Sequence, residues 1–309
     1  MKPFPLALIL CAVSLSSCSL SIGGNGLFPS SSDKSSESLP LSSADASSGP
    51  FIDVLGIYPN MHVSSLTEEG KNLIEGLNGI SPDEYGFYYY GSNYYMKAKA
   101  AASPMGLALK FSDGEEVREG EEYYFLCEPI EWKILSSENG LIHLISSFII
   151  DTEIFDEDSN NYASSHIREW LNGSFFKTAF AHARSSNIER VDVDNSAETT
   201  AFYPNDNVCD DTIDFVYLPS FKEIFNSDAA IEEADSWIYA TDYALARGLF
   251  LDQANSLGYK ENLEFYWTRS PFNTNAQQSS CVMTGGDHAV NEVNLAGVGV
   301  RPCITVNSY

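Results

Sequence analysis

Basic residues are scarce in this sequence. Seventeen lysines and arginines stand against 43 aspartates and glutamates among 309 residues, which gives a formal net charge of −26 at pH 7. Affinity for nucleic acid comes mainly from basic side chains that neutralise phosphates, so this composition excludes nucleic acid as a partner. The same charge repels anionic lipid headgroups, and attachment to a membrane therefore has to be covalent or apolar.

The N-terminal apolar run, Phe4 to Val13, is too short to span a bilayer, which takes roughly 20 residues. It follows the basic residue Lys2, as in a secretory signal peptide. Leu15 precedes Cys18 by three positions with two small residues between them, which resembles the bacterial lipobox. We expect residues 1–17 to be a lipoprotein signal peptide and Cys18 to carry a diacylglyceryl anchor, whose two chains bind a membrane stably. The alternative is an ordinary signal peptide that is cleaved nearby.

A serine-rich segment follows the predicted anchor. Residues 30–48 contain ten serines among nineteen positions and almost no apolar side chain, so they cannot form a core. We expect residues 18–50 to be a flexible tether with a reach of about 30 Å. Residues 51–309 are then a single globular domain, exported and held on the outer face of the bacterial cytoplasmic membrane.

Sequence motifs that would name a reaction are absent. The five histidines form no H-E-x-x-H or other close ligand pair, so a zinc hydrolase is not supported. No G-x-S-x-G elbow occurs, so a serine hydrolase of the α/β type is not supported. No Walker A loop and no G-x-G-x-x-G turn after a strand occurs either, so nucleotide binding is not supported. The sequence therefore predicts no catalytic residue, no metal ligand, no cofactor and no nucleotide partner.

Acidic clusters are the one feature that suggests a metal ion. Calcium prefers several oxygen ligands, and three clusters offer carboxylates. None of them follows the spacing of an EF-hand loop, so solvated acidic loops are the favoured interpretation. The clusters are Asp156–Asp158, Asp192 with Asp194, and Asp206 with Asp210 and Asp211.

Cysteines are few. Apart from Cys18 and one cysteine in the signal peptide, the chain has Cys127, Cys209, Cys281 and Cys303. In an exported protein four cysteines allow three connectivities, and the sequence does not choose among them. We favour a Cys281–Cys303 pair, because both lie on short strand-like runs near the C-terminus. The alternative is four buried thiols that act as small apolar side chains.

Hydrophobic patterning predicts an α+β fold with short elements. Helical spacing occurs at residues 65–77, at residues 164–180 with a possible break at Asn172-Gly173, and in short pieces at 219–225 and 229–251. Aromatic runs on both sides of Gly91-Ser92-Asn93 predict a β-hairpin, in which the tyrosines form cross-strand pairs or a sugar-binding face. Further strands are expected at residues 123–126, 130–135, 141–150 and in brief runs from 265 to 306.

Two arginine-containing segments near the C-terminus carry a family resemblance. Trp267–Pro271 and Gly299–Pro302 resemble the W-x-R-S-P and G-V-R-P motifs of a domain of unknown function in secreted and lipid-anchored bacterial proteins. Other stretches agree in order: residues 55–59, 128–135, 144–151, 167–176 and 241–248. The motif positions that we expect to be structural are Trp132, Arg168, Trp170, Arg269 and Arg301. In such an acidic chain the last two are expected to pair internally with carboxylates.

That family is similar in turn to C-type-lectin-like folds, which include the formylglycine-generating enzymes, or sulfatase-modifying factors. The resemblance implies a single α+β domain of short mixed and antiparallel sheets, a few short helices and long loops. It does not imply the activity, because the close cysteine pair of the oxidases, the histidine cluster of the iron-dependent relatives and the calcium-lectin motifs are all missing here.

The resulting functional hypothesis is a non-catalytic surface module that binds a glycan or a protein. Its candidate binding residues are on loops of the C-terminal half, where recognition residues usually lie: Trp267, Asn273, Asp287 and Asn294. One alternative is an extracellular enzyme that acts on a surface polymer, which requires two opposed acids of raised pKa in one pocket. A structural envelope protein is the other alternative.

Overall fold

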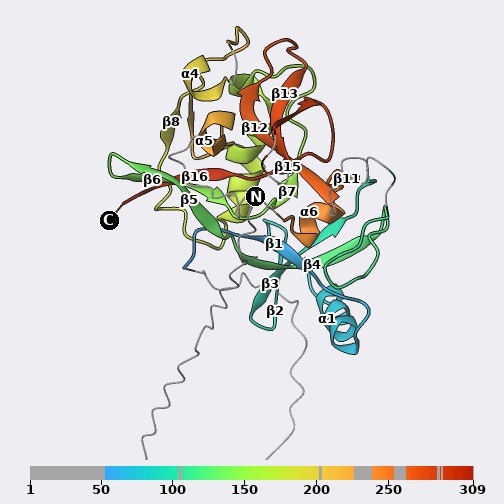
Figure 1. Ribbon diagram of the computed structural model, residues 1–309. Helices are drawn as coiled ribbons and strands as arrows, with labels where there is room; N and C mark the ends of the chain where they lie inside the picture. The colour runs from blue at the N-terminus through green and yellow to red at the C-terminus, as the bar shows by residue number, and fades with distance from the viewer. Residues whose placement is uncertain are drawn as a thin grey trace, which may run out of the picture. The chain divides into compact units, whose positions relative to one another are not determined.

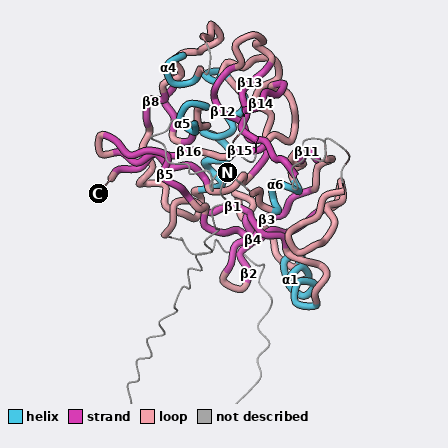
Figure 2. Tube along the Cα trace, viewed as in Figure 1, coloured by secondary structure: helices cyan, strands magenta, loops and turns pink. Residues whose placement is uncertain are grey.

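The computed structural model describes residues 53–308, apart from 104–105, 107, 202–203, 226–238, 254–261, 284–285 and 287. The described residues belong to one compact unit that combines several small sheets with short helices, which confirms the expected α+β class. Figure 2 shows the loops that connect these short elements. None of the described helices is long and apolar enough to cross a membrane. The predicted signal peptide, Cys18 and the tether lie outside the described residues.

The first sheet is antiparallel. In spatial order its strands are β1 (Ile57–His62), β4 (Glu122–Pro129), β3 (Asn93–Lys99) and β2 (Phe87–Tyr90). Strands β2 and β3 form the expected hairpin, and its turn residues Gly91 and Ser92 both have positive φ, as a type I′ turn requires. Tyr88 lies directly opposite Tyr95, so the tyrosines of this hairpin form cross-strand pairs that stabilise it.

Helix α1 (Glu68–Asn78) packs on this sheet beside β4 (Figure 1). The Thr67 hydroxyl caps the helix by accepting a hydrogen bond from the Gly70 amide at 3.0 Å. Leu73 and Leu77 recur at helical spacing and pack against tyrosines of β2, β3 and β4. The helix begins slightly later than the patterning predicts, because Thr67 supplies the cap.

The second sheet brings the C-terminal strand between two earlier segments. In spatial order its strands are β10 (Val216–Tyr217), β16 (Cys303–Asn307), β6 (Leu141–Ser146) and β5 (Trp132–Glu138). Asn139 and Gly140 have positive φ and make the tight turn between β5 and β6 at the predicted place. Strand β16 pairs antiparallel with both β6 and β10, so the last strand of the chain lies in the interior of this sheet.

The third sheet contains both arginine-containing segments. In spatial order its strands are β14 (His288–Glu292), β13 (Gln278–Met283), β12 (Asn262–Pro271), β15 (Gly299–Val300) and β7 (Asp151–Thr152), with β11 (Leu251–Gln253) also on β12. The β12–β15 pair is parallel, with Tyr266 opposite Gly299. The strand that precedes Arg301 therefore lies directly beside the strand that carries Arg269.

The predicted helix at residues 164–180 is continuous rather than broken. It consists of α2 (His166–Trp170), a π-helical turn η2 (Leu171–Phe175) and α3 (Phe176–Ala179). Asn172-Gly173, the predicted break, lies inside the π-helical turn, where the Asn172 amide donates to the carbonyl oxygens of Arg168 and Val216. The remaining short elements are η1 (Tyr162–Ser164), β8 (Val191–Val193), α4 (Ala197–Thr200), β9 (Thr212–Asp214), α5 (Phe221–Phe225) and α6 (Asp242–Ala246).

One large core cluster joins these sheets and helices. It includes Phe125 from the first sheet, Ile304 from the second, Trp267 from the third and Leu171 from the helical segment. All four side chains are fully buried. Segments that are far apart in the sequence therefore share a single core.

Gly299 is expected to be intolerant of a side chain. A Cβ at this position would lie 2.4 Å from Ile149 Cγ2 and 2.8 Å from the carbonyl oxygen of Phe265, so the parallel β12–β15 pair would have to open. Gly299→Ala should lower the free energy of unfolding by about 1–3 kcal/mol, the usual cost of overpacking. Urea unfolding followed by circular dichroism measures it. Gly173→Ala is the matched control, because nothing lies within 4 Å of the place that its methyl group would occupy; equal stability of the two variants would contradict the expectation.

Candidate functional site

Of the four residues that the sequence suggests for binding, the structure places one, Trp267, inside the fold. Trp267 is fully buried, and its indole Nε1 donates to the carbonyl oxygen of Glu153 at 2.8 Å, so its assignment to a binding surface is wrong. The cause is that β12 lies inside the third sheet and not on a loop. Asn273 is half-buried and its amide donates to the Pro204 carbonyl, whereas Asn294 is exposed in a turn. Asp287 lies outside the described residues.

Arg269 pairs with a carboxylate, as expected. Its guanidinium is 2% exposed and makes two hydrogen bonds to the carboxylate of Glu223, at 2.5 and 2.6 Å. Glu223 also accepts a hydrogen bond from the Ser220 amide, while its own amide donates to the Ser220 hydroxyl, which is a capping box at the start of α5. The neighbouring Ser270 hydroxyl accepts from the Phe221 amide at 2.8 Å. Arg269 and Ser270 therefore bind the same helix end.

Arg301 differs from the expectation. It is 1% exposed, but among the described residues its partners are a carbonyl oxygen and a ring rather than a carboxylate. Its Nε and one terminal nitrogen donate to the carbonyl oxygen of Ser146 at 3.0 and 2.7 Å, and the guanidinium lies 5.0 Å from the centre of the Tyr266 ring. A backbone carbonyl and an aromatic face take the place of an anion here.

The other three predicted structural positions also make fixed contacts. Arg168 forms a two-oxygen contact with the buried carboxylate of Asp214, at 2.9 and 3.0 Å from its Nε. The Trp132 indole donates to the Leu55 carbonyl at 2.7 Å. The Trp170 ring packs against a neighbouring phenylalanine in the same helical segment. A pocket of about 570 Å³ opens beside Arg168, but the charge of Arg168 is already paired with Asp214.

The favoured Cys281–Cys303 disulfide is absent. The four cysteines after Cys18 are free thiols, and these two lie on β13 of the third sheet and β16 of the second. Burial raises the pKa of the Cys281 thiol to about 12 and also raises that of Cys303. Both thiols are therefore protonated at neutral pH and pack as small apolar groups.

One carboxylate in each of the three acidic clusters accepts hydrogen bonds from groups of the protein. Asp156 accepts hydrogen bonds from the Asp158 and Ser159 amides and from the His166 amide at the start of α2. Asp194 likewise binds groups at the start of α4, and Asp211 binds a nearby backbone amide. These carboxylates stabilise turns and helix ends; calcium binding by them stays a prediction.

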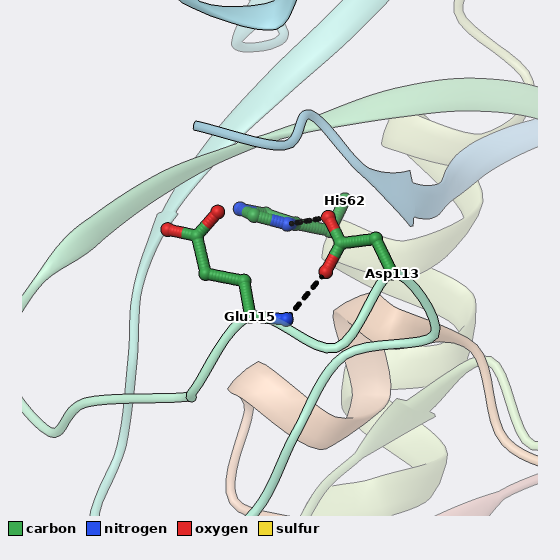
Figure 3. A group of neighbouring side chains, drawn as sticks. All are labelled: His62, Asp113 and Glu115. Carbon is green, nitrogen blue, oxygen red and sulfur yellow. Dashed lines mark hydrogen bonds and ion pairs between the residues drawn. The ribbon is translucent and has the colours of Figure 1, made fainter. Parts of the chain in front are cut away.

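A group of metal-ligating side chains forms elsewhere, where β1 ends. Within the described part of the chain, His62, Asp113 and Glu115 are the group of three such residues whose ligand atoms all lie within 4.8 Å of one another. Figure 3 shows the imidazole between the two carboxylates. Its Nδ1 lies 2.9 Å from an Asp113 oxygen, and the His62 side chain is 1% exposed. We call these three residues the His–carboxylate cluster.

The two acids of the cluster lie on one tight turn. The Gly114 amide donates to the Phe111 carbonyl at 2.9 Å, and an Asp113 oxygen accepts from the Glu115 amide at 2.8 Å. Gly114 has a φ of +90°, a conformation that glycine adopts without strain. Burial raises the pKa of Asp113, but hydrogen bonds from the Glu115 amide, His62 and Ser64 outweigh it, so this pKa lies below its usual value.

Rings hold the imidazole in place. His62 stacks on Phe111 with ring centres 4.1 Å apart, and the edges of Tyr123 and Phe125 close the remaining sides at 5.2 and 6.0 Å. Glu115 is held in turn by Ser65, whose amide and hydroxyl donate to its two oxygens at 2.8 and 2.6 Å. The cluster is therefore organised before any ligand arrives.

Asp242, the first residue of α6, ties this cluster to the rest of the fold. One of its oxygens accepts from the His62 amide at 3.0 Å and the Ser112 hydroxyl at 2.7 Å, and the other accepts from the Ser112 amide at 2.7 Å. A carboxylate that accepts three hydrogen bonds fixes the end of β1 and the acidic turn relative to each other.

The cluster forms part of a pocket of about 370 Å³ under helix α1. This volume lies within the range of small-molecule sites. The lining residues come from the first sheet, α1 and the acidic turn: His62, Val63, Ser65, Ile74, Asn78, Lys97, Glu115, Glu121, Glu122, Tyr123 and Tyr124. Tyr124 donates to the Asn78 side chain at 2.9 Å, and Lys97 pairs with Glu122 at 2.9 Å. The lining thus combines aromatic rings with hydrogen-bonding side chains.

Residues 139–308 match the family model described as Domain of unknown function (DUF6273). The chain belongs to the DUF6273 family. No curated protein and no solved structure matches the chain. The DUF6273 match contains Asp242, Arg269 and Arg301, whereas the His–carboxylate cluster precedes it.

Spacing in the sequence gives no sign of this cluster in the DUF6273 protein. His62 and Asp113 are 51 positions apart, and Asp242 lies 180 positions from His62. The only local signal is Asp113-Gly114, a dipeptide typical of turns. It predicts the turn but not the histidine that lies across from it.

Because of the Arg269–Glu223 pair, the free energy of unfolding of the DUF6273 domain should decrease as the pH becomes acidic. Glu223→Gln is expected to lower the free energy of unfolding at pH 7 by about 3 kcal/mol, the low end for buried pairs, because the Glu223 side chain keeps 30% exposure. Burial raises the pKa of Glu223, but Arg269 outweighs it and the pKa is lowered. The stabilisation is therefore full above the unfolded value of about 4.3 and is lost as pH falls through the folded value.

Thermal unfolding from pH 3 to 8 tests this. The difference between the wild type and Glu223→Gln should be largest near pH 7 and shrink at the acid end. Glu198→Gln on the neighbouring α4 is the control, since Glu198 is exposed. A difference that stays constant with pH would contradict the assigned pairing.

Proposed function

We propose that this chain is a bacterial surface lipoprotein, held to the outer face of the cytoplasmic membrane by a diacylglyceryl group on Cys18. The apolar run, the Leu15–Cys18 spacing and the serine-rich tether support this. The folded domain then stands about 30 Å from the membrane on its tether. An extended position of this kind suits the capture of an extracellular ligand.

The domain acts as a non-catalytic binding module in this proposal, and the pocket under α1 is its binding site. The observation that carries the assignment is the pocket lining, in which the rings of Tyr123 and Tyr124 lie among Asn78, Glu115 and Glu121. Carboxylate and amide oxygens accept hydrogen bonds from hydroxyl groups, and aromatic rings pack against apolar faces. A neutral glycan presents both, and a pocket of about 370 Å³ suits one or two sugar units.

Charge favours a neutral ligand over an anionic one. The one basic residue of the lining, Lys97, is paired with Glu122, and its pKa is raised chiefly by that hydrogen bond. The other ionised residues of the lining are acidic. Glu121 lies 3.8 Å from Arg118, but Glu115 has no ion pair among the described residues, so in the metal-free pocket it would repel an anionic ligand.

The positions of the carboxyl groups with raised pKa favour ligand binding over hydrolysis as the function of the pocket. A glycoside hydrolase needs two opposed carboxyl groups in one pocket, one of which has a raised pKa so that it can act as the acid. Burial raises the pKa of Asp151 and raises that of Glu264 to about 8, but neither of them lines the pocket under α1. Asp151 instead accepts a hydrogen bond from the Tyr58 hydroxyl at 2.6 Å and binds Arg247.

The finer fold relationship is also part of this proposal. Small mixed and antiparallel sheets, with the W-x-R-S-P and G-V-R-P segments on or next to adjacent strands, are what a C-type-lectin-like or sulfatase-modifying-factor-like domain leads us to expect. The resemblance adds support to ligand binding at a loop-rich surface, without naming the ligand.

Loss of the anchor cysteine should release the protein. Cys18→Ala is expected to abolish labelling by an alkyne analogue of palmitate and to move the chain from the membrane fraction to the medium. Fractionation of expressing cells followed by immunoblotting measures this. Cys11→Ala lies in the apolar run and should leave both labelling and fractionation unchanged. Retention of Cys18→Ala in the membrane with undiminished labelling would contradict the anchor.

The binding proposal is tested on the detergent-solubilised full chain with an array of neutral and acidic glycans. Saturable binding of a neutral glycan is expected, and Glu121→Gln should weaken it about tenfold, the effect of losing one charge-assisted hydrogen bond. Glu119→Gln is the matched control, because Glu119 is exposed on the same loop and does not line the pocket. Absence of saturable glycan binding, or equal affinities for the two variants, would contradict the proposal.

A further inference from the structure

We propose that the His–carboxylate cluster binds one zinc ion at the wall of the pocket under α1. The sequence predicts no metal ligand, and the calcium candidates lie on other loops. The metal site does not depend on the glycan proposal, because it concerns the ion alone. It rests on the identity, spacing and orientation of His62, Asp113 and Glu115.

The first argument is distance. The three ligand atoms lie within 4.8 Å of one another, whereas ligands at about 2.0–2.2 Å from a tetrahedral zinc ion are about 3.4 Å apart. The carboxylate side chains would have to move toward the imidazole to close this difference. Asp113 keeps 24% of its side chain exposed, so it has room to rotate.

The second argument is the orientation of the imidazole. The His62 side chain is almost completely buried, and in the described part of the chain its Nδ1 is the ring nitrogen with a hydrogen-bond partner, Asp113. A zinc ion bound at Nδ1 would take the place of this hydrogen bond and meet the Asp113 carboxylate as well as the ring. The stacked ring of Phe111 prevents the imidazole from turning away to solvent.

The third argument is charge. Two carboxylates lie against one histidine, and the basic residue of the same pocket, Lys97, pairs with Glu122 instead of with them. A divalent cation would compensate both acids. Glu115 can bind a metal while it holds Ser65, since a carboxylate has about four acceptor positions.

Ligand chemistry selects zinc over calcium. Calcium and magnesium take oxygen ligands, calcium as many as six to eight, whereas an imidazole nitrogen suits zinc and its neighbours among the transition metals. Three protein ligands leave a position for water or for an incoming group, as at zinc sites that are open to a substrate. His62 and Glu115 both line the pocket, so an ion held by them would lie at its wall.

Metal binding is measured on the metal-free full chain with Zn²⁺ alone, by isothermal titration calorimetry in the presence of a competing chelator. One zinc ion per chain is expected, and millimolar Ca²⁺ should not displace it. Co²⁺ in place of zinc should give the visible absorption of a four- or five-coordinate site. Less than stoichiometric zinc, or displacement by calcium, would overturn the proposal.

Two near-isosteric variants identify the ligands. Asp113→Asn and Glu115→Gln should each weaken zinc binding at least about 100-fold, because loss of even an outer partner costs about 10–100-fold. Glu119→Gln, on the same loop but outside the cluster, should bind zinc like the wild type. Circular dichroism of the metal-free variants verifies that each is folded. Zinc affinity that is equal in Asp113→Asn and Glu119→Gln would overturn the assignment.

The outcomes of the zinc and glycan experiments distinguish a failure of the metal site from a failure of the proposed binding function. If zinc binds and no glycan does, the metal site stands and the proposed binding function is wrong. If a glycan binds equally with and without zinc, and zinc does not bind stoichiometrically, the metal assignment is wrong and the binding function stands.

Discussion

The buried ion pair between Arg269 and Glu223 is the contact on which the packing of the third sheet depends. A guanidinium removed from water destabilises the fold by several kcal/mol unless it is paired and its hydrogen bonds are satisfied. Glu223 can meet this need only at the start of α5, because the same carboxylate also binds the Ser220 amide in the capping box. Arg301 donates to the Ser146 carbonyl instead of a carboxylate, and one of its terminal nitrogens is buried without a hydrogen-bond partner among the described residues. These two arginines therefore fix β12 against α5 and the end of β15 against β6.

At the candidate site, Asp242 is the residue that holds distant segments of the chain together. Its two oxygens bind donors of His62 and Ser112, which lie 180 and 130 positions earlier in the sequence. Because a carboxylate has about four acceptor positions, it accepts from all three donors at once, of which the His62 amide is buried. The orientation of the cluster thus depends on where α6 begins. Thr241, whose hydroxyl caps α6, sets that position through the Ala244 amide.

The sequence predicts the local elements of this fold better than its contacts. The Gly91-Ser92 and Asn139-Gly140 turns follow from their glycines, which adopt positive φ without strain. The existence of α1 follows from its helical spacing, although the patterning starts it slightly before its capping threonine. The sequence places Trp267 on a surface because nothing local shows that β12 lies inside a sheet. The π-helical turn at Asn172 depends on the carbonyl of Val216, a partner 44 positions away. The His–carboxylate cluster escapes prediction for the same reason, since segments far apart in the sequence build it.

The family match covers the part of the fold that supports the candidate site but not the residues that line its pocket. The match begins at residue 139, so it covers the whole third sheet and the strands β6, β10 and β16 of the second, but none of the first. The pocket lies between the first sheet and α1, outside the matched residues. Asp242 is the matched residue that contacts the cluster. The matched region therefore explains how the site is held in place, and the ligand has to be sought outside it, where the first sheet meets α1.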